Sequence, residues 1–176
     1  EELAQLGRAL ENASEADDEQ LSLAALMPES AVEVPLAART RSSVIRKMIE
    51  VASQTGWLWS PDEMAEAVEQ REAMYSTALD NGVALLHPRR PLETALAQPF
   101  IALGVTQQGI PFGNPRGGLT DVFFLLASVT DRDHLRALAR LSRVIDDAET
   151  LSSIRQAESA AAARKVLLEA EQTMFG

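Results

Sequence analysis

DNGVALLH, residues 80–87, is the stretch from which the fold of this chain can be worked out. Asp80, Asn81 and Gly82 are residue types that favour a tight turn. The run from Val83 to Leu86 is wholly apolar and shows no polar alternation, which predicts a strand buried on both faces. Such a strand belongs inside a sheet covered by helices on both sides. His87 stands where this strand ends.

Other elements are predicted on either side of this strand. Apolar runs predict further strands at Val32 and Val34, at 100–106, at 110–112 after a turn at Gly109, and at 121–129. Helical spacing predicts helices at 42–54 with Ser42 or Ser43 as cap, at 61–73 after Ser60, at 131–145, and two more of which the last is capped near Ser159. This order predicts an α/β fold, a mixed β-sheet flanked by helices on both faces.

The chain divides into two parts by its pattern. Residues 1–20 begin with leucines at helical spacing and then turn acidic, which predicts a short N-terminal helix and a linker from an upstream domain. Residues 21–176 carry all the other predicted elements, and their length suits one domain.

The composition excludes several classes of protein and site. The chain has 46% apolar and 24% charged residues and no apolar run near the roughly 18 residues that span a bilayer, so no membrane segment is expected. A net charge of −10 argues against direct nucleic-acid binding and favours proteins as partners. Without cysteine, neither a disulfide nor a thiolate metal site is expected, which fits a cytoplasmic protein. No metal or other cofactor is implied.

Histidine chemistry in this chain depends on His87 and His134, its two histidines. His87 is followed by Pro88, Arg89, Arg90 and Pro91. A neutral imidazole is a nucleophile toward phosphorus, and nearby guanidinium groups both favour the neutral ring and pair with a phosphoryl product. The plain alternative is that His87 only ends a strand and that the two arginines are solvated surface charges.

Residues 71–87 carry a resemblance to a known family. Arg71 and Glu72 end a helix, and Ser76 and Thr77 lead through a turn into the strand that closes on His87. This arrangement resembles the signature of the enzyme IIA domains of the bacterial phosphoenolpyruvate-dependent sugar phosphotransferase system, fructose/mannitol (nitrogen-regulatory) type. The Gly109-Ile110-Pro111-Phe112 segment and the His134-Leu135 motif follow in the family's order, so the resemblance covers the chain from about Leu21 to its end.

The resemblance implies a role for each matching residue. His87 would receive the phosphoryl group, His134 would lie beside it as a second active-site histidine, and Arg71 would help to hold the phosphate. Thr77 would shape the turn into the strand, and Arg89 and Arg90 would contact phosphate or partner. Taken without the family, the favoured explanation of His134 is a histidine with a local hydrogen bond at a helix start, and the alternative for Arg71 is an ordinary helix-end ion pair.

The family also implies partners. The donor would be the histidine phosphocarrier protein, and the chain would pass the group to a transporter domain or use it as a regulatory signal. The alternative is a non-catalytic interaction module that kept the fold but lost phosphotransfer. The sequence departs from the family at Ala78 and Asp80, where glycines are usual, and at Leu86, where proline is usual. Ala78 would be strained if that position required a positive φ angle.

Overall fold

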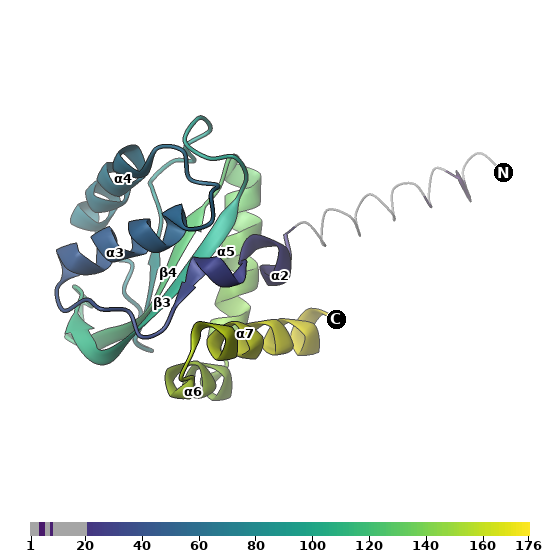
Figure 1. Cartoon of the computed structure of the whole chain (residues 1–176). Coiled ribbons are helices and arrows are strands. Elements are labelled where there is room, and N and C mark those ends of the chain that lie inside the picture. Colours follow the sequence, from purple (N-terminus) through teal and green to yellow (C-terminus); the bar gives the residue numbers. More distant parts are fainter. Residues whose placement is uncertain (1–3, 6–7, 9–20) are drawn as a thin grey trace.

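A computed structural model describes residues 4, 5, 8 and 21–176 of the chain. The helix and linker predicted over residues 1–20 lie outside this part apart from those three residues, so that assignment stays a prediction. The described chain forms a mixed β-sheet with helices on both faces (Figure 1), which confirms the predicted fold class.

The sheet has four strands in the order β1-β3-β4-β2. Their bounds are Val32–Glu33 for β1, Val83–Leu86 for β2, Phe100–Pro111 for β3 and Leu119–Ala127 for β4. The central pair β3 and β4 is antiparallel, whereas β1 runs parallel to β3 and β2 runs parallel to β4. The predicted strand at Val83–Leu86 is confirmed, and all its residues are buried.

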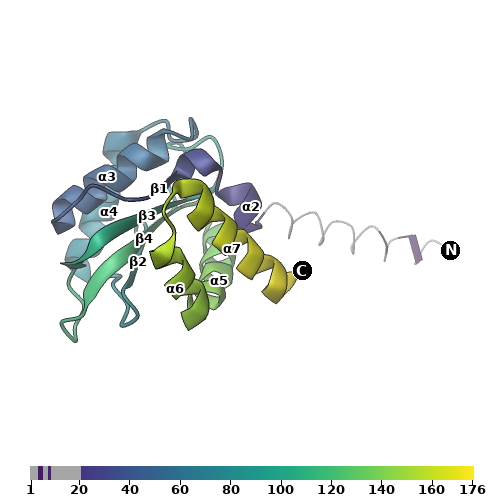
Figure 2. The same ribbon diagram turned by 60° about the horizontal axis from the view of Figure 1, so that its bottom comes forward.

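Helices cover both faces of this sheet. They are α2 (Leu23–Leu26), α3 (Arg41–Ser53), α4 (Pro61–Met74), α5 (Asp131–Ile145), α6 (Ala148–Gln156) and α7 (Ala160–Phe175), with a 3-10 turn at Glu29–Ala31. Figure 2 shows α3 and α4 on one side of the sheet and α5, α6 and α7 on the other. The strand residues between these layers are almost entirely buried, so the sheet itself forms the centre of the core.

Capping side chains explain where several helices begin. Helix α3 is capped by Thr40, not by Ser42 or Ser43 as predicted; the Thr40 hydroxyl accepts from the Ser43 amide, and the Ser43 hydroxyl accepts from the Thr40 amide. This reciprocal pair satisfies two amides that the helix itself leaves free. The predicted starts at Ser60 and Ser159 are confirmed, although the Ser60 side chain makes no capping hydrogen bond.

Strand β3 corrects one sequence prediction. The predicted strands at 100–106 and 110–112 are a single strand, and Gly109 lies within it, not in a turn. The register of β3 against β4 shifts between Val105 and Ile110. Of the residues between these two, Thr106 is buried and the others are exposed. A Cβ atom on Gly109 would lie 2.7 Å from Leu119 Cβ, so glycine is needed here for close approach of the two strands.

The topology brings two chain segments to one edge of the sheet. Because β2 and β4 are parallel, with Leu86 opposite Leu125, both strands end at the same edge. The chain leaves β2 directly into His87, and it leaves β4 through a short connection into α5, whose first turns carry His134. Two residues far apart in sequence are thereby placed at the same edge.

Candidate active site

His87 and His134 form the centre of the site. Their ring centroids lie 5.0 Å apart and the ring planes are tilted by 41°. Both side chains are partly buried, His87 at the end of β2 and His134 in the first turns of α5. The structure therefore brings together the two histidines that the resemblance implied would share one site.

A backbone hydrogen bond sets the tautomer of His87. Nδ1 of His87 lies 2.8 Å from the carbonyl oxygen of Leu85. A carbonyl oxygen can only accept, so Nδ1 carries the ring proton in the neutral side chain. The lone pair of the neutral ring is then on Nε2, the nitrogen that is available to attack an electrophile.

Burial lowers the pKa of both histidines, so each ring stays neutral at pH values where an exposed histidine begins to be protonated. It lowers the pKa of His87, the Leu85 hydrogen bond raises it, and the charge of Arg71 lowers it further, with a net decrease from 6.5. The pKa of His134 is also lowered, by burial and then by the charge of His87, against the opposing effect of Asp131. At neutral pH both rings are therefore mainly uncharged.

Arg71, predicted to hold phosphate, lines a cavity of about 460 Å³ together with His87. It lies in the last turn of α4, and its Nη1 donates a hydrogen bond to the carbonyl oxygen of Tyr75. The other lining residues are Tyr75, Ser76, Thr77, Ala78, Leu79, Asp80, Leu85, Pro115, Arg116 and Leu138. The cavity thus joins the end of α4, the turn before β2 and the end of β2.

Thr77 is held by a buried carboxylate that the sequence analysis gave no role. Glu72 is 2% exposed; its carboxylate accepts a hydrogen bond from the Thr77 hydroxyl and lies 3.2 Å from the Thr77 amide nitrogen. The guanidinium group of Arg41 lies 3.6 Å from the same carboxylate. Thr77 in turn accepts a backbone hydrogen bond from Leu85, whose carbonyl binds His87. The buried Glu72 therefore anchors the turn on which the orientation of His87 depends.

The departures from the family pattern do not strain the turn before β2. Among the described residues that are not glycine, none has a positive φ angle, so Ala78 occupies its position without the strain considered above. Gly82 supplies the left-handed conformation instead, with φ of 84°. Leu86 is fully buried in the sheet, where an apolar side chain packs well.

Arg89 and Arg90 follow His87 along the chain, and their predicted contact with phosphate or a partner stays a prediction. Both are exposed, and neither lines the cavity that holds His87. Pro88, between His87 and these arginines, is buried. Arg116 lines the cavity in their place, from the loop between β3 and β4, and its Nη1 lies 3.4 Å from Oδ2 of Asp80. This long-range placement has no local signal in the sequence.

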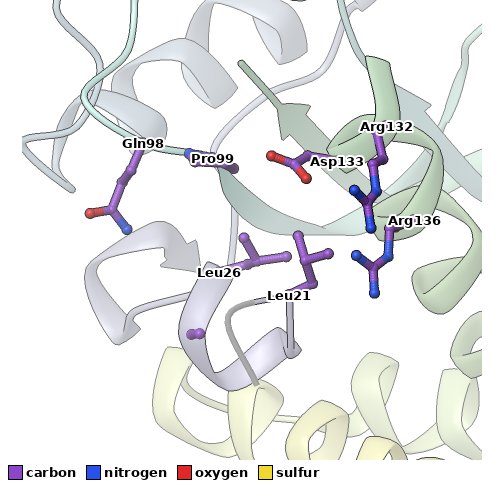
Figure 3. Close-up of a pocket in the computed structure, with 8 residues that line it drawn as sticks. Leu21, Leu26, Gln98, Pro99, Arg132, Asp133 and Arg136 are labelled. Carbon is purple, nitrogen blue, oxygen red and sulfur yellow. The ribbon is translucent and has the colours of Figure 1, made fainter. Parts of the chain in front are cut away.

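A second cavity, of about 400 Å³, lies beside α2 and holds neither histidine (Figure 3). It is lined by Leu21, Ala25, Leu26, Gln98, Pro99, Arg132, Asp133 and Arg136. Residues four apart share a helix face, so Arg132 and Arg136 point the same way from α5, whereas His134 between them is turned toward His87. The two faces of α5 therefore serve separate cavities.

Within residues 4, 5, 8 and 21–176, no helix is both long enough and apolar enough to cross a bilayer.

Comparisons with known proteins agree with the resemblance stated from the sequence. The sequence model of the family described as "Phosphoenolpyruvate-dependent sugar phosphotransferase system, EIIA 2" matches residues 25–170. The nitrogen regulatory protein of Bradyrhizobium diazoefficiens is 31% identical over 141 residues, which cover 78% of this chain and 90% of that protein. The fructose-specific EIIABC component of Bacillus subtilis is 25% identical over 141 residues, or 79% of this chain but 22% of that longer protein.

Solved structures share the fold. In the complex of the mannitol enzyme IIA with phosphorylated enzyme IIB from Escherichia coli, the matching chain is 17% identical and superposes with a TM-score of 0.71. The match covers 81% of this chain and 97% of that chain. At this identity the comparison supports the layered fold described above, including its two-sided cover of helices.

Proposed function

The chain belongs to the EIIA 2 family of the phosphoenolpyruvate-dependent sugar phosphotransferase system, and on this basis we propose that it accepts a phosphoryl group on Nε2 of His87. The observation that carries the proposal is the hydrogen bond from Nδ1 of His87 to the Leu85 carbonyl. This bond places the proton on one ring nitrogen and leaves the lone pair of the other for the reaction. The lowered pKa of His87 keeps that lone pair available at neutral pH.

The reaction balances without an additional base. The Nε2 lone pair forms a bond to the phosphorus atom of a donor phosphohistidine, and the electron pair of the donor's breaking N–P bond returns to the donor nitrogen. The Nδ1 proton of His87 stays on its ring throughout. Transfer of this kind depends chiefly on in-line positioning and on charge stabilisation, which a hydrogen bond to the backbone and nearby cations supply.

Arg71 and His134 are the residues that support the charged product. The Arg71 guanidinium lines the His87 cavity and is a fixed positive charge with donors that suit phosphate oxygens. The ring of His134 is 5.0 Å from that of His87, close enough for a group on His87 to be approached by both rings. We assign Arg71 to charge stabilisation and His134 to a hydrogen bond with the phosphoryl oxygens.

A protein is favoured over a small molecule as phosphoryl donor. Tyr75 and Leu79 line the cavity and are 68% and 39% exposed, and Leu135, next to His134, is 63% exposed. Exposed apolar side chains around a reactive group are typical of a surface that a partner protein covers. We propose the histidine phosphocarrier protein as this donor, in the cytoplasm where that system operates.

The group then has two possible destinations. The Bacillus relative is named a fructose-specific EIIABC component and the mannitol enzyme IIA was solved with phosphorylated enzyme IIB, whereas the Bradyrhizobium relative is named a nitrogen regulatory protein. The regulatory relative is the more similar in sequence and matches over most of its own length. We therefore propose a regulatory domain whose phosphorylation state is a signal, in preference to a domain committed to sugar uptake.

The test is intact-mass measurement after incubation with phosphoenolpyruvate, the general phosphotransferase enzyme and the phosphocarrier protein. The parent is expected to gain one acid-labile phosphoryl group, and His87→Ala is expected to gain none. Arg46→Gln, which changes an exposed residue on α3, is the control for loss of a surface charge. A folded parent that gains no group while a known enzyme IIA domain in the same mixture does would favour the non-catalytic interaction module.

A further inference from the structure

Asp80 and Arg116 form an ion pair on the wall of the cavity that holds His87. Arg116 Nη1 lies 3.4 Å from Asp80 Oδ2, and the two side chains are 82% and 60% exposed. Both residues line this cavity, one from the turn before β2 and the other from the loop between β3 and β4. The pair thus links two chain segments beside the reactive imidazole.

We propose that Arg116 is a phosphorylation-dependent switch: it pairs with Asp80 while His87 is unmodified and moves to the phosphoryl group once His87 carries one. This inference rests on the proposed function, since it requires a phosphoryl group on His87. It adds a second arginine to that site and a structural change that a partner can detect.

The charges determine the direction of the exchange. An exposed ion pair is held weakly because water screens it and two long side chains must be ordered. A phosphoryl group offers more negative charge than a carboxylate and three acceptor oxygens, and a guanidinium group can donate two parallel hydrogen bonds to it. Asp80 also repels the new anion. Movement of Arg116 from Asp80 to the phosphoryl group places a positive charge beside that anion and so favours the phosphorylated state.

The loop that carries Arg116 is anchored close to Asp80. Asn114 is buried; its Nδ2 donates to the carbonyl oxygen of Leu79 at 3.0 Å, and its Oδ1 accepts from the Arg116 amide at 2.8 Å. These bonds hold the Arg116 backbone beside the cavity while its side chain extends into solvent. In this proposal the exchange is a rotation of the Arg116 side chain, to which the exposed residues Gly117 and Gly118 adjust.

Asp80 has a defined part in this proposal. In the unmodified protein it holds Arg116 away from His87, and it competes with the phosphoryl group for the same guanidinium donors. Asp80→Asn is therefore expected to favour phosphorylation through Arg116. If Asp80→Asn acted only by removing a negative charge, it would favour phosphorylation of His87 equally with or without Arg116. The double variant therefore distinguishes action through Arg116 from loss of charge alone.

The experiment compares the parent with Asp80→Asn, Arg116→Gln, the double variant, and Arg46→Gln as a charge-matched control. Each protein is equilibrated with phosphorylated phosphocarrier protein, and the equilibrium constant for transfer is measured. Arg116→Gln is expected to lower this constant by about tenfold or more, as for loss of a hydrogen bond to a charged group. Asp80→Asn is expected to raise it in the parent background but much less in the Arg116→Gln background, while Arg46→Gln stays at the parent value.

The amide resonances of Gly117 and Gly118 give a second measurement that does not depend on a donor protein. Potassium phosphoramidate can modify a histidine chemically, with ammonia leaving as the new N–P bond forms. Modification of His87 is expected to shift these resonances in the parent and much less in Arg116→Gln. In unmodified Asp80→Asn they are expected to lie closer to their positions in the modified parent.

The outcomes separate the switch from the proposed function. The switch is overturned, and the function left intact, if modification of His87 shifts the Gly117 and Gly118 resonances as much in Arg116→Gln as in the parent. The same conclusion holds if Arg116→Gln leaves the equilibrium constant for transfer unchanged. A folded parent that takes no phosphoryl group from either donor overturns both.

Discussion

The ring of His87, directly after β2, lies 5.0 Å from the ring of His134, in the first turns of α5. The pairing has an electrostatic cost when both rings are protonated, because the positive charge of His87 lowers the pKa of His134. Two neutral rings can share one phosphoryl group, with one ring as acceptor and the other as hydrogen-bond donor.

His134→Gln is expected to slow transfer to His87 by about tenfold to a hundredfold, the size of a lost hydrogen bond to a charged group. The measurement is the initial rate of phosphoryl gain from the phosphocarrier protein, followed by intact mass. Because His87 is retained, the variant should still be modified, whereas His87→Gln should not. A parent-like rate in folded His134→Gln would remove His134 from the site.

Arg71→Gln is expected to raise the pKa of His87, since the Arg71 charge is one of the two causes that lower it. Titration of the imidazole proton resonances can measure this directly, as the chain contains two histidines. His134 is the internal reference because Arg71 is not among the causes of its shift, and its pKa should change less. An unchanged or lower pKa of His87 would contradict this placement of Arg71.

Stability is expected to decrease as the pH falls below 6.5, the ordinary histidine value. In the folded protein both histidines have lowered pKa values, so between those values and 6.5 the unfolded chain binds more protons than the folded one. The free energy of unfolding must then decrease as the pH falls through this window. Urea denaturation should show the decrease, and the double variant His87→Gln, His134→Gln should show a smaller one. Equal pH dependence in both proteins would contradict the assignment.

Thr77→Val is expected to lower the free energy of unfolding by about 1–3 kcal/mol, because it removes a donor from the buried Glu72 carboxylate. Thr173→Val, at an exposed position of α7, should change it by about 0.5 kcal/mol or less. Urea denaturation compares the two. A Thr77→Val protein as stable as the control would show that Glu72 does not need this hydroxyl.

Gly82→Ala and Gly56→Ala separate backbone strain from crowding. Both glycines have positive φ angles, so alanine at either position is expected to cost about 1–2 kcal/mol. At Gly56 a Cβ atom meets nothing within 4 Å, but at Gly82 it would lie 2.5 Å from Arg155 Nη2. Arg155 Nη2 donates to the carbonyl oxygen of Asn81 at 2.5 Å, and that contact must adjust. Thermal or urea unfolding should therefore show the greater loss for Gly82→Ala, and equal losses would mean that Arg155 moves freely.

Some elements of the site could be predicted from local patterns. The apolar run before His87 predicted β2, the apolar spacing after Asp131 predicted α5 with its correct bounds, and the family signature implied that His134 would join His87. Arg89 and Arg90 show a limit of such patterns: they follow His87 in sequence but do not line its cavity, because neighbours in sequence need not point into the same cavity. Pro88 is buried, whereas both arginines beyond it are exposed.

Arg116 and Glu72 illustrate what local patterns could not show. Arg116 reaches the His87 cavity because the loop between β3 and β4 is tied to Leu79 through Asn114, a contact between segments far apart in sequence. Glu72 reads in sequence as one of a pair at a helix end, yet it is buried and binds the turn that leads to β2. Neither relationship has a periodicity or motif that would reveal it.

By itself the sequence determined the buried strand before His87, the longer helices and the layered class of this protein, because apolar spacing records which face of each element avoids water. It also determined which side chains can carry the chemistry, since the chain has two histidines. The tertiary structure alone decided which charges surround His87, how far apart the imidazoles lie, and on which nitrogen the proton of His87 resides. Those properties depend on strand order, burial and contacts between distant segments, which are set only when the whole chain packs.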